Sequence, residues 1–401
     1  MGGGPRAHRH RSPGWIAAAL LTLMVAAGCS SSDAPQAVRS NDSAPRSSAS
    51  PTTAAKAVDD ASLEQPGAFG VGRTTVNLAD QKRPGRTLTT DIWYPIKPGT
   101  GTEPSLYQFD ASIPAFDLNV AKANAPLSPG GPFPLVVFSH GSPSIRYQSL
   151  FFMELLASHG FVVAAPDHAG DSAVDALRGS LASPAETAAN RPADISFVID
   201  ALLGGDVADP PGLAAAVDPK RVGIVGHSRG GDTVLAVAGG RSGVPRDERV
   251  DAVLAWTPLS AAAPDESLAS IDVPTMLFGA TLDDVTPIEP NVERPWNLVV
   301  GRPLYRVDLL GGGHDQFTNV CEFRAAADAN PDFPAALRPI VDVPAQDACT
   351  PELLPIAVAH TLITRYSMAF LLAHVSGDEA AAAWLRSSPA SAPNTSFAAR
   401  T

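Results

Sequence analysis

One short turn constrains the fold of this chain more than any other feature of its 401 residues. The apolar run over 222–225 predicts a buried strand, and residues 232–238 have a pattern typical of a packed helix. Between them lies a G-x-S-x-G motif, Gly226-His-Ser-Arg-Gly230. In a strand–turn–helix of this kind the central residue is strained, and the two glycines remove side chains that would clash. The sequence therefore predicts that the Ser228 hydroxyl is exposed at the end of a strand.

Predicted strands and helices alternate along residues 67–386, which favours a mostly parallel sheet with helices on both faces. The run over 133–138 is continuously apolar, as expected of a strand covered on both faces. A helix is predicted from Arg191 to Leu203, with Pro192 near its first turn. In such sheets the chemistry lies at the carboxyl ends of the strands.

A serine hydroxyl becomes a good nucleophile only when a base takes its proton and an acid orients that base. His314 follows a predicted strand over 305–309 in a glycine-rich loop, a position that no other of the nine histidines has. The acid should follow the predicted strand over 275–278. There the pattern Gly-x-x-Leu-Asp-x-x-x-Pro favours Asp283, with Asp284 as the alternative.

Acyl transfer also needs two N–H groups that stabilise the developing oxyanion. The backbone of Arg229, directly after the serine, is expected to supply one. The backbone N–H of Ser142, in the loop after an early strand, is expected to supply the other. The Arg229 side chain either reaches the cleft, where it would favour an acidic or phosphate-bearing substrate, or points to solvent or pairs with a nearby acid.

This ordered set of motifs resembles the α/β-hydrolases. The resemblance is to the branch of dienelactone hydrolase and the platelet-activating-factor acetylhydrolases, and to the bacterial polyester-degrading cutinases. It implies an α/β-hydrolase fold and an acid at the cutinase position, which Asp283 occupies. It also implies that Trp256 lines the substrate cleft, the alternative being that Trp256 packs in the core. The residues that carry the resemblance are 92–95, 137–141, 157–168, 191–194, 226–230 and 313–314.

We therefore expect a serine carboxylic-ester hydrolase that acts on a small-molecule or lipid ester through an acyl-enzyme. The alternatives are a lipase or cutinase-like polyester hydrolase, and a non-catalytic lipoprotein that binds a ligand. No cofactor is expected, and no metal, because no His, Cys and Asp residues stand at metal-ligand spacing. The formal net charge of −12 argues against a nucleic-acid partner.

Residues 1–28 are expected to be a lipoprotein-type signal peptide. A basic start precedes an apolar run over 15–27 that is too short to span a bilayer comfortably. Ala26-Ala-Gly-Cys29 resembles a bacterial lipoprotein cleavage site, which implies that Cys29 is lipidated. The protein is then exported and anchored to the outer face of the cell membrane, with secretion as the alternative. Residues 29–66 are expected to form a flexible linker and residues 387–401 a disordered tail.

Two further cysteines, Cys321 and Cys349, are predicted to form a disulfide, because disulfides persist in exported domains. The alternative is a pair of free buried thiols. The stretch between them contains four prolines and little periodicity, which predicts a long loop. Residues 318–350 are expected to act as a partial lid or as a wall of the cleft.

Overall fold

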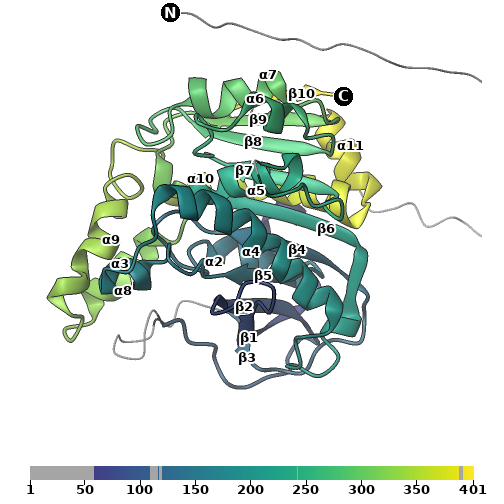
Figure 1. Cartoon of the computed structure of the whole chain (residues 1–401), viewed down its shortest axis with the longest axis vertical. Helices are drawn as coiled ribbons and strands as arrows, with labels where there is room; N and C mark the ends of the chain where they lie inside the picture. The colour runs from purple at the N-terminus through teal and green to yellow at the C-terminus, as the bar shows by residue number, and fades with distance from the viewer. Residues whose placement is uncertain (1–57, 109–115, 117–119, 242, 388–391) are drawn as a thin grey trace, which may run out of the picture. The chain divides into compact units, whose positions relative to one another are not determined.

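The computed structural model describes residues 58–108, 116, 120–241, 243–387 and 392–401. Its strands are β1 (Gly70–Ala79), β2 (Thr87–Ile96), β3 (Lys122–Ala123), β4 (Phe133–Ser139), β5 (Val162–Pro166), β6 (Val217–His227), β7 (Ala252–Trp256), β8 (Thr275–Ala280), β9 (Leu304–Leu309) and β10 (Thr395–Arg400). Within the described residues they form one sheet in the order β10-β9-β8-β7-β6-β4-β5-β2-β1-β3 (Figure 1).

The centre of the sheet is parallel. Strand β4 pairs in parallel with β5 and β6, and β6, β7, β8 and β9 continue the parallel pairing. Strand β2 runs antiparallel to β1 and β5, and β10 runs antiparallel to β9. The loops that follow β4, β6, β8 and β9 therefore meet at one edge of the sheet, where α/β sheets bind their ligands.

Helices cover both faces of the sheet, as the alternation of elements predicts. Successive residues of β4 alternate between two cores, because side chains of a strand point to opposite faces. Val136 and Phe138 pack in the core that α2 and α10 cover, and Leu135 and Val137 in the core that α4 and α5 cover. The helices are α1 (Asp60–Glu64), α2 (Leu150–Ser158), α3 (Ala173–Arg178), α4 (Pro184–Gly204), α5 (Arg229–Gly239), α6 (Asp265–Ala269), α7 (Arg294–Leu298), α8 (Val320–Ala329), α9 (Arg338–Ala345), α10 (Ile356–Leu371) and α11 (Glu379–Ser387).

Helix α4 begins earlier than the sequence predicts. The Ser183 hydroxyl accepts the N–H of Glu186, and the Glu186 carboxylate accepts the N–H of Ser183, which is a capping box. Pro184 occupies the first turn, where a missing N–H costs nothing. Pro192 therefore lies inside the helix and not near its first turn.

The segment between Cys321 and Cys349 is helical, so the expectation of a long loop is wrong. Helices α8 and α9 occupy most of it. The predicted disulfide is present, with 5.7 Å between the two Cα atoms. Both cysteines pack against a small cluster of Val320, Ala345 and Ala348. The short apolar faces of the two helices thus bury each other. Proline content and weak periodicity, on which the loop prediction is based, do not reveal such short faces.

Both boundaries of the predicted domain also need correction. Residues 392–401 are not a disordered tail, because β10 pairs with the edge strand β9 and the Phe397 ring stacks on Tyr366 at 5.4 Å between centroids. The predicted linker over 29–66 is structured at its end, where α1 buries Leu63 completely. The predicted signal peptide, the lipidation site Cys29 and the remainder of the linker lie outside the described residues.

Candidate active site

Ser228 lies in the turn between β6 and α5, with φ 58° and ψ −119°. A positive φ is unusual for a residue with a side chain, and such strain is concentrated at functional sites. Two glycines make the turn possible. A Cβ on Gly226 would lie 2.1 Å from the carbonyl oxygen of Gly230, and a Cβ on Gly230 would lie 1.9 Å from that of Ser139. The strained turn that the G-x-S-x-G motif predicts is therefore present.

The structure brings the serine, the histidine and one of the two candidate acids together. His314 Nε2 lies 2.9 Å from Ser228 Oγ, and His314 Nδ1 lies 2.8 Å from Asp283 Oδ2. Asp283 is buried and Asp284 is exposed. The backbone N–H of Thr286 and its hydroxyl also donate to the Asp283 carboxylate, both at 2.6 Å. Asp283 is thus fixed in an orientation that holds the imidazole.

The two partners shift each other's protonation. Burial alone would raise the pKa of Asp283, but hydrogen bonds from His314 and Thr286 and the charge of His314 lower the pKa below its usual value. Burial would lower the pKa of His314, yet the hydrogen bond and charge of Asp283 raise the pKa above its usual value. His314 is therefore a stronger base than an isolated histidine, and its Nε2 faces the serine hydroxyl.

The two backbone groups expected to bind an oxyanion come from the residue after Ser228 and from the loop after β4. Arg229 is the first residue of α5, and the first N–H groups of a helix have no partner within the helix. Ser142 follows β4 and lines the same cavity as Ser228. The preceding N–H, that of Gly141, is already bonded to Gln148 Oε1 at 2.8 Å. The geometry therefore favours Ser142 over Gly141 as the second donor.

Gln148 and His227 join the three loops of the site. Gln148 Oε1 accepts the N–H of Gly141, and its Nε2 donates to His227 Nδ1 at 3.0 Å. His227 Nε2 in turn donates to the carbonyl oxygen of His314 at 3.0 Å. Burial, and then the charge of His314, lower the pKa of His227 to about 3, so the ring stays neutral and keeps this tautomer. No motif in the sequence points to Gln148.

The buried side chain of Arg191 fixes the loop that contains Ser142. Arg191, in α4, is 1% exposed and donates to the carbonyl oxygens of His140 and Gly141. Its guanidinium pairs with Asp171 at 3.2 Å, and Asp171 accepts the hydroxyl of Ser142 at 2.6 Å. The loop is therefore fixed by charge-assisted bonds, which are stronger than neutral ones.

A second serine, histidine and aspartate lie in contact behind this loop. Ser139 Oγ is 2.9 Å from His168 Nε2, and His168 Nδ1 is 2.9 Å from Asp194 Oδ2. All three residues are fully buried, and Asp194 is also bonded to Arg86 at 2.5 Å. Burial and the charge of Arg191 lower the pKa of His168 to about 4. These residues do not line the cavity beside Ser228 and form part of the support of the site.

A cavity of about 560 Å³ opens beside Ser228 and His314. One wall comes from the disulfide-linked segment, which fits the expectation of a cleft wall. The Arg229 side chain does not line the cavity. In the described parts of the chain no three His, Cys, Asp or Glu side chains are placed to hold a metal. The apolar residues of the walls are Ile145, Ala173, Ala176, Leu177, Val285, Val320, Phe323, Ala336, Pro339, Ile340, Val341, Val343 and Pro344.

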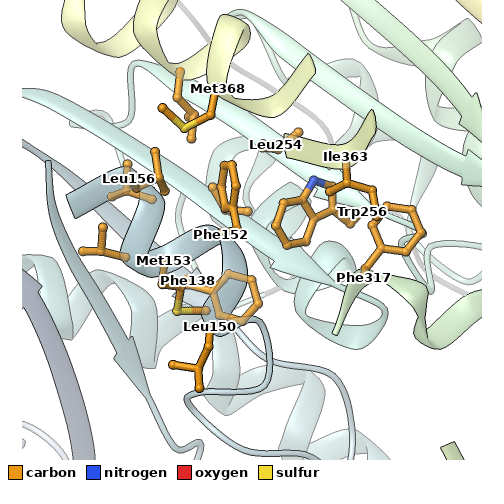
Figure 2. Packing of buried hydrophobic residues seen from close by; sticks show 14 of the residues in the cluster. Phe138, Leu150, Phe152, Met153, Leu156, Leu254, Trp256, Phe317, Ile363 and Met368 are labelled. Atoms are coloured by element: carbon orange, nitrogen blue, oxygen red, sulfur yellow. The ribbon is translucent and has the colours of Figure 1, made fainter. Parts of the chain in front are cut away.

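Trp256 does not line the cleft, so the role implied by the resemblance to cutinases is wrong. Its side chain is fully buried and packs against the ring of Phe152 at 5.0 Å (Figure 2). The indole N–H donates to the Ser367 hydroxyl at 3.1 Å. Because Trp256 ends β7 on the face covered by α2 and α10, its ring fills the core between them.

A serine on a strained turn after a central parallel strand, with an acid and a histidine from later strands, defines the α/β-hydrolases. A family model described as platelet-activating factor acetylhydrolase, isoform II, matches residues 110–192. A solved ferulic acid esterase from Streptomyces cinnamoneus superposes with a TM-score of 0.61 at 26% identity, covering 84% of this chain and 98% of the esterase.

Two curated relatives agree with that class. The platelet-activating factor acetylhydrolase of Cavia porcellus is 32% identical over 148 residues, 29% of this chain and 34% of the relative. Cutinase est1 of Thermobifida alba is 26% identical over 165 residues, 41% of this chain and 47% of the relative. The chain thus matches less than half the length of these relatives. Together with the fold, the matches support an α/β-hydrolase that is similar to the acetylhydrolases and the cutinases.

Proposed function

We propose that the protein is a serine carboxylic-ester hydrolase. The observation that carries the proposal is the pair of contacts, 2.9 Å from Ser228 Oγ to His314 Nε2 and 2.8 Å from His314 Nδ1 to Asp283 Oδ2, beside an open cavity. The relatives' names support it, since they are an acetylhydrolase, a cutinase and a ferulic acid esterase.

In the proposed reaction Ser228 Oγ attacks the ester carbonyl carbon while His314 takes the hydroxyl proton. Asp283 holds the imidazole and balances the imidazolium charge. The backbone N–H groups of Arg229 and Ser142 stabilise the oxyanion. His314 then gives its proton to the leaving alcohol. Water, activated by the same histidine, attacks the acyl-enzyme and releases the acid and the free serine.

Replacing the nucleophile tests this proposal. We expect Ser228→Ala to lower kcat on p-nitrophenyl butyrate by roughly a millionfold, as in subtilisin. The wild-type protein should react with a fluorophosphonate probe, and the variant should not. Activity that survives the substitution would exclude Ser228 as the nucleophile. A folded wild-type protein that neither reacts with the probe nor hydrolyses the ester would instead favour a non-catalytic ligand-binding role.

A lipase or polyester hydrolase is the second candidate, and the exposed aliphatic side chains that line the cavity favour it. Three of the lining side chains are exposed to solvent although they are aliphatic, namely Leu177 at 39%, Val285 at 55% and Val343 at 62%. They come from α3, from the loop after β8 and from α9, and all three line the same cavity. Activity that increases with acyl chain length, or on emulsified or polymeric esters, would favour this candidate over a small-ester hydrolase.

We further propose that the protein is exported and anchored to the outer face of the cell membrane through lipidated Cys29. The lipoprotein-like sequence around Cys29 supports the anchor. The disulfide between Cys321 and Cys349 supports export, since disulfides persist outside the reducing cytoplasm.

A further inference from the structure

Gln148 lies where the three loops of the site meet, and its hydrogen bonds have only one possible direction. The residue is 3% exposed and lines the cavity beside Ser228. Because the backbone N–H of Gly141 can only donate, the amide atom that faces it is Oε1, which leaves Nε2 as the donor to His227 Nδ1. His227 Nε2 faces the carbonyl oxygen of His314 and therefore carries the ring proton.

The first bond of this series fixes a glycine, the residue type whose backbone is otherwise the most free to rotate. The N–H of Gly141 is held by Gln148 at 2.8 Å. On its other side, the carbonyl oxygen of Gly141 accepts from His140 Nδ1 at 2.6 Å and from Arg191 Nη2 at 3.2 Å. His140 can donate there because its Nε2 accepts the backbone N–H of His168, and burial keeps the ring neutral by lowering the pKa of His140 well below its usual value. Neither peptide plane at Gly141 can therefore turn without breaking a hydrogen bond.

The orientation of Gly141 decides where the N–H of Ser142 points. The two residues are joined by a trans peptide, in which the N–H lies opposite to the carbonyl oxygen. Because that oxygen faces Arg191, which does not line the cavity, the Ser142 N–H points away from Arg191. Within the described part of the chain this N–H donates to no other group, and Ser142 lines the cavity beside Ser228. The N–H is therefore available to an oxyanion.

The second half of the series connects this loop to the catalytic histidine. The ring of His227, directly before Ser228, bonds to Gln148 on one side and to the backbone of His314 on the other. The ring centroids of His227 and His314 are 4.8 Å apart. Burial, and then the charge of His314, lower the pKa of His227 to about 3. The His227 ring thus stays neutral, and its hydrogen bonds keep their direction, while His314 gains and loses its proton.

The backbone around Gln148 is itself anchored to the loop that follows His314. The carbonyl oxygen of Gln148 accepts the N–H of Asn319 at 2.7 Å, and the hydroxyl of Ser149 donates to the carbonyl oxygen of Phe317 at 2.8 Å. The side-chain amide of Gln148 therefore extends from a fixed base, as precise placement of a catalytic group requires of its supporting residues.

We propose that Gln148 is a positioning residue for ester hydrolysis, which holds the Ser142 N–H where the oxyanion forms and keeps the loop of His314 in place beside it. The inference rests on the proposed ester hydrolysis and adds a residue to it. Both polar atoms of the Gln148 side chain are already bonded within the protein, so the amide does not bind the ester itself. Its loss should raise the energy of the transition state and leave the binding of the ester unchanged.

Gln148→Met keeps the length of the side chain and removes both hydrogen bonds. On p-nitrophenyl butyrate we expect kcat to fall by about ten- to hundredfold with KM within about twofold of the wild-type value. The reason is that displacing an oxyanion donor costs part of the roughly 100- to 1000-fold that removing it costs.

A transition-state analogue gives a second measurement of the same effect. The carbonyl carbon of a butyl trifluoromethyl ketone forms a bond to Ser228 Oγ, the hydroxyl proton passes to His314, and the ketone oxygen becomes the oxyanion. Gln148→Met should weaken the binding of this ketone by about the factor by which kcat falls, because both depend on the same N–H donors.

His227→Phe tests whether the series acts as a unit, since it keeps a ring and removes both nitrogens. The variant that combines it with Gln148→Met should have a kcat within about threefold of the lower of the two single variants. Losses that multiply would show that Gln148 and His227 act independently, and would overturn the proposed connection between the loops.

Asn291→Leu is the matched control. The Asn291 side chain is also a buried amide that joins two loops, since it accepts the N–H of Ala261 and donates to the carbonyl oxygen of Pro287, but it does not line the cavity. This variant should unfold at a lower urea concentration and keep kcat within about twofold of the wild-type value. An equal loss of kcat in Asn291→Leu and Gln148→Met would overturn the inference, because general loosening would then explain both.

The inference is also overturned if Gln148→Met leaves kcat unchanged, or if a higher KM accounts for all of its lost activity, since Gln148 would then bind the substrate. If Gln148→Met does not fold, His227→Phe decides by the same criterion of a lower kcat at a constant KM. A wild-type protein that neither hydrolyses p-nitrophenyl butyrate nor reacts with a fluorophosphonate would contradict the proposed function, and this inference with it. An active wild-type protein with an unaffected Gln148→Met variant would contradict the inference alone.

Discussion

At the scale of single residues, the two neighbouring acids Asp283 and Asp284 show how position decides function. Both follow strand β8, which is where the sequence predicts the catalytic acid. Only Asp283 turns into the sheet edge, where it accepts bonds from Thr286 and contacts His314. Asp284 faces solvent. The two side chains are chemically identical. Substituting each one in turn therefore separates the effect of the contact between Asp283 and His314 from the effect of a negative charge nearby.

We predict that Asp283→Asn lowers kcat on p-nitrophenyl butyrate by about ten-thousandfold, as the equivalent change does in the Ser-His-Asp triad of serine proteases. Asp284→Asn should stay within about twofold of the wild-type value, as expected of an exposed substitution. A similar loss in both variants would show that general negative charge matters and not the contact with His314.

The pH profile gives an independent measurement of the same contact. His314 must be neutral to accept a proton, and Asp283 raises its pKa. The kcat/KM of the wild-type protein should therefore decrease as the pH falls, with a midpoint above the usual histidine value of about 6.5. The residual activity of Asp283→Asn should have a midpoint at lower pH, because the carboxylate that stabilised the imidazolium is gone.

At the scale of elements, helices α8 and α9 form a wall of the cavity and are joined by the disulfide between Cys321 and Cys349. The bond closes a loop over a sequence separation of 28 residues. Without it, the two helices are still joined by the contact of Val320 with Ala345 and Ala348, and by the ion pairs Asp328–Arg338 and Arg324–Asp342.

We predict that replacing both cysteines with serine lowers the free energy of unfolding by about 2–4 kcal/mol, the usual effect of closing a loop of this size. Urea unfolding measures this. Because the wall loosens, KM should rise more for a long-chain p-nitrophenyl ester than for the acetate. An unchanged midpoint together with an unchanged KM ratio would show that the helices hold the wall unaided.

The elements that the sequence predicts well are those with a strong local pattern. The parallel strands are continuous apolar runs, and the serine, acid and histidine each follow one of them, so their meeting at one edge was predictable. Trp256 was misplaced because the end of a strand does not reveal which of two faces its side chain joins. Strand β10 and helices α8 and α9 were missed because their apolar faces are short and gain stability only from partners distant in sequence.

At the scale of the whole molecule, the proposed membrane anchor concerns residues outside the described part of the chain. We predict that metabolic labelling with a fatty acid modifies the full-length protein and that Cys29→Ala abolishes the label. The variant should move from the membrane fraction to the soluble fraction while keeping its activity on p-nitrophenyl butyrate. A labelled Cys29→Ala protein, or an unlabelled wild-type protein, would exclude the lipid anchor.

The fully buried set of Ser139, His168 and Asp194 has the same three side-chain types, and nearly the same spacings, as the set at Ser228. A template search on atomic positions alone would count two reactive centres in this protein. No ester can reach Ser139 Oγ, because the residue is fully buried. The carboxylate of Asp194 already pairs with the neighbouring arginines. A catalytic triad therefore differs from a structural one in whether substrate can reach the serine, more than in how the three side chains are arranged. A template search should include the solvent accessibility of the serine as a criterion.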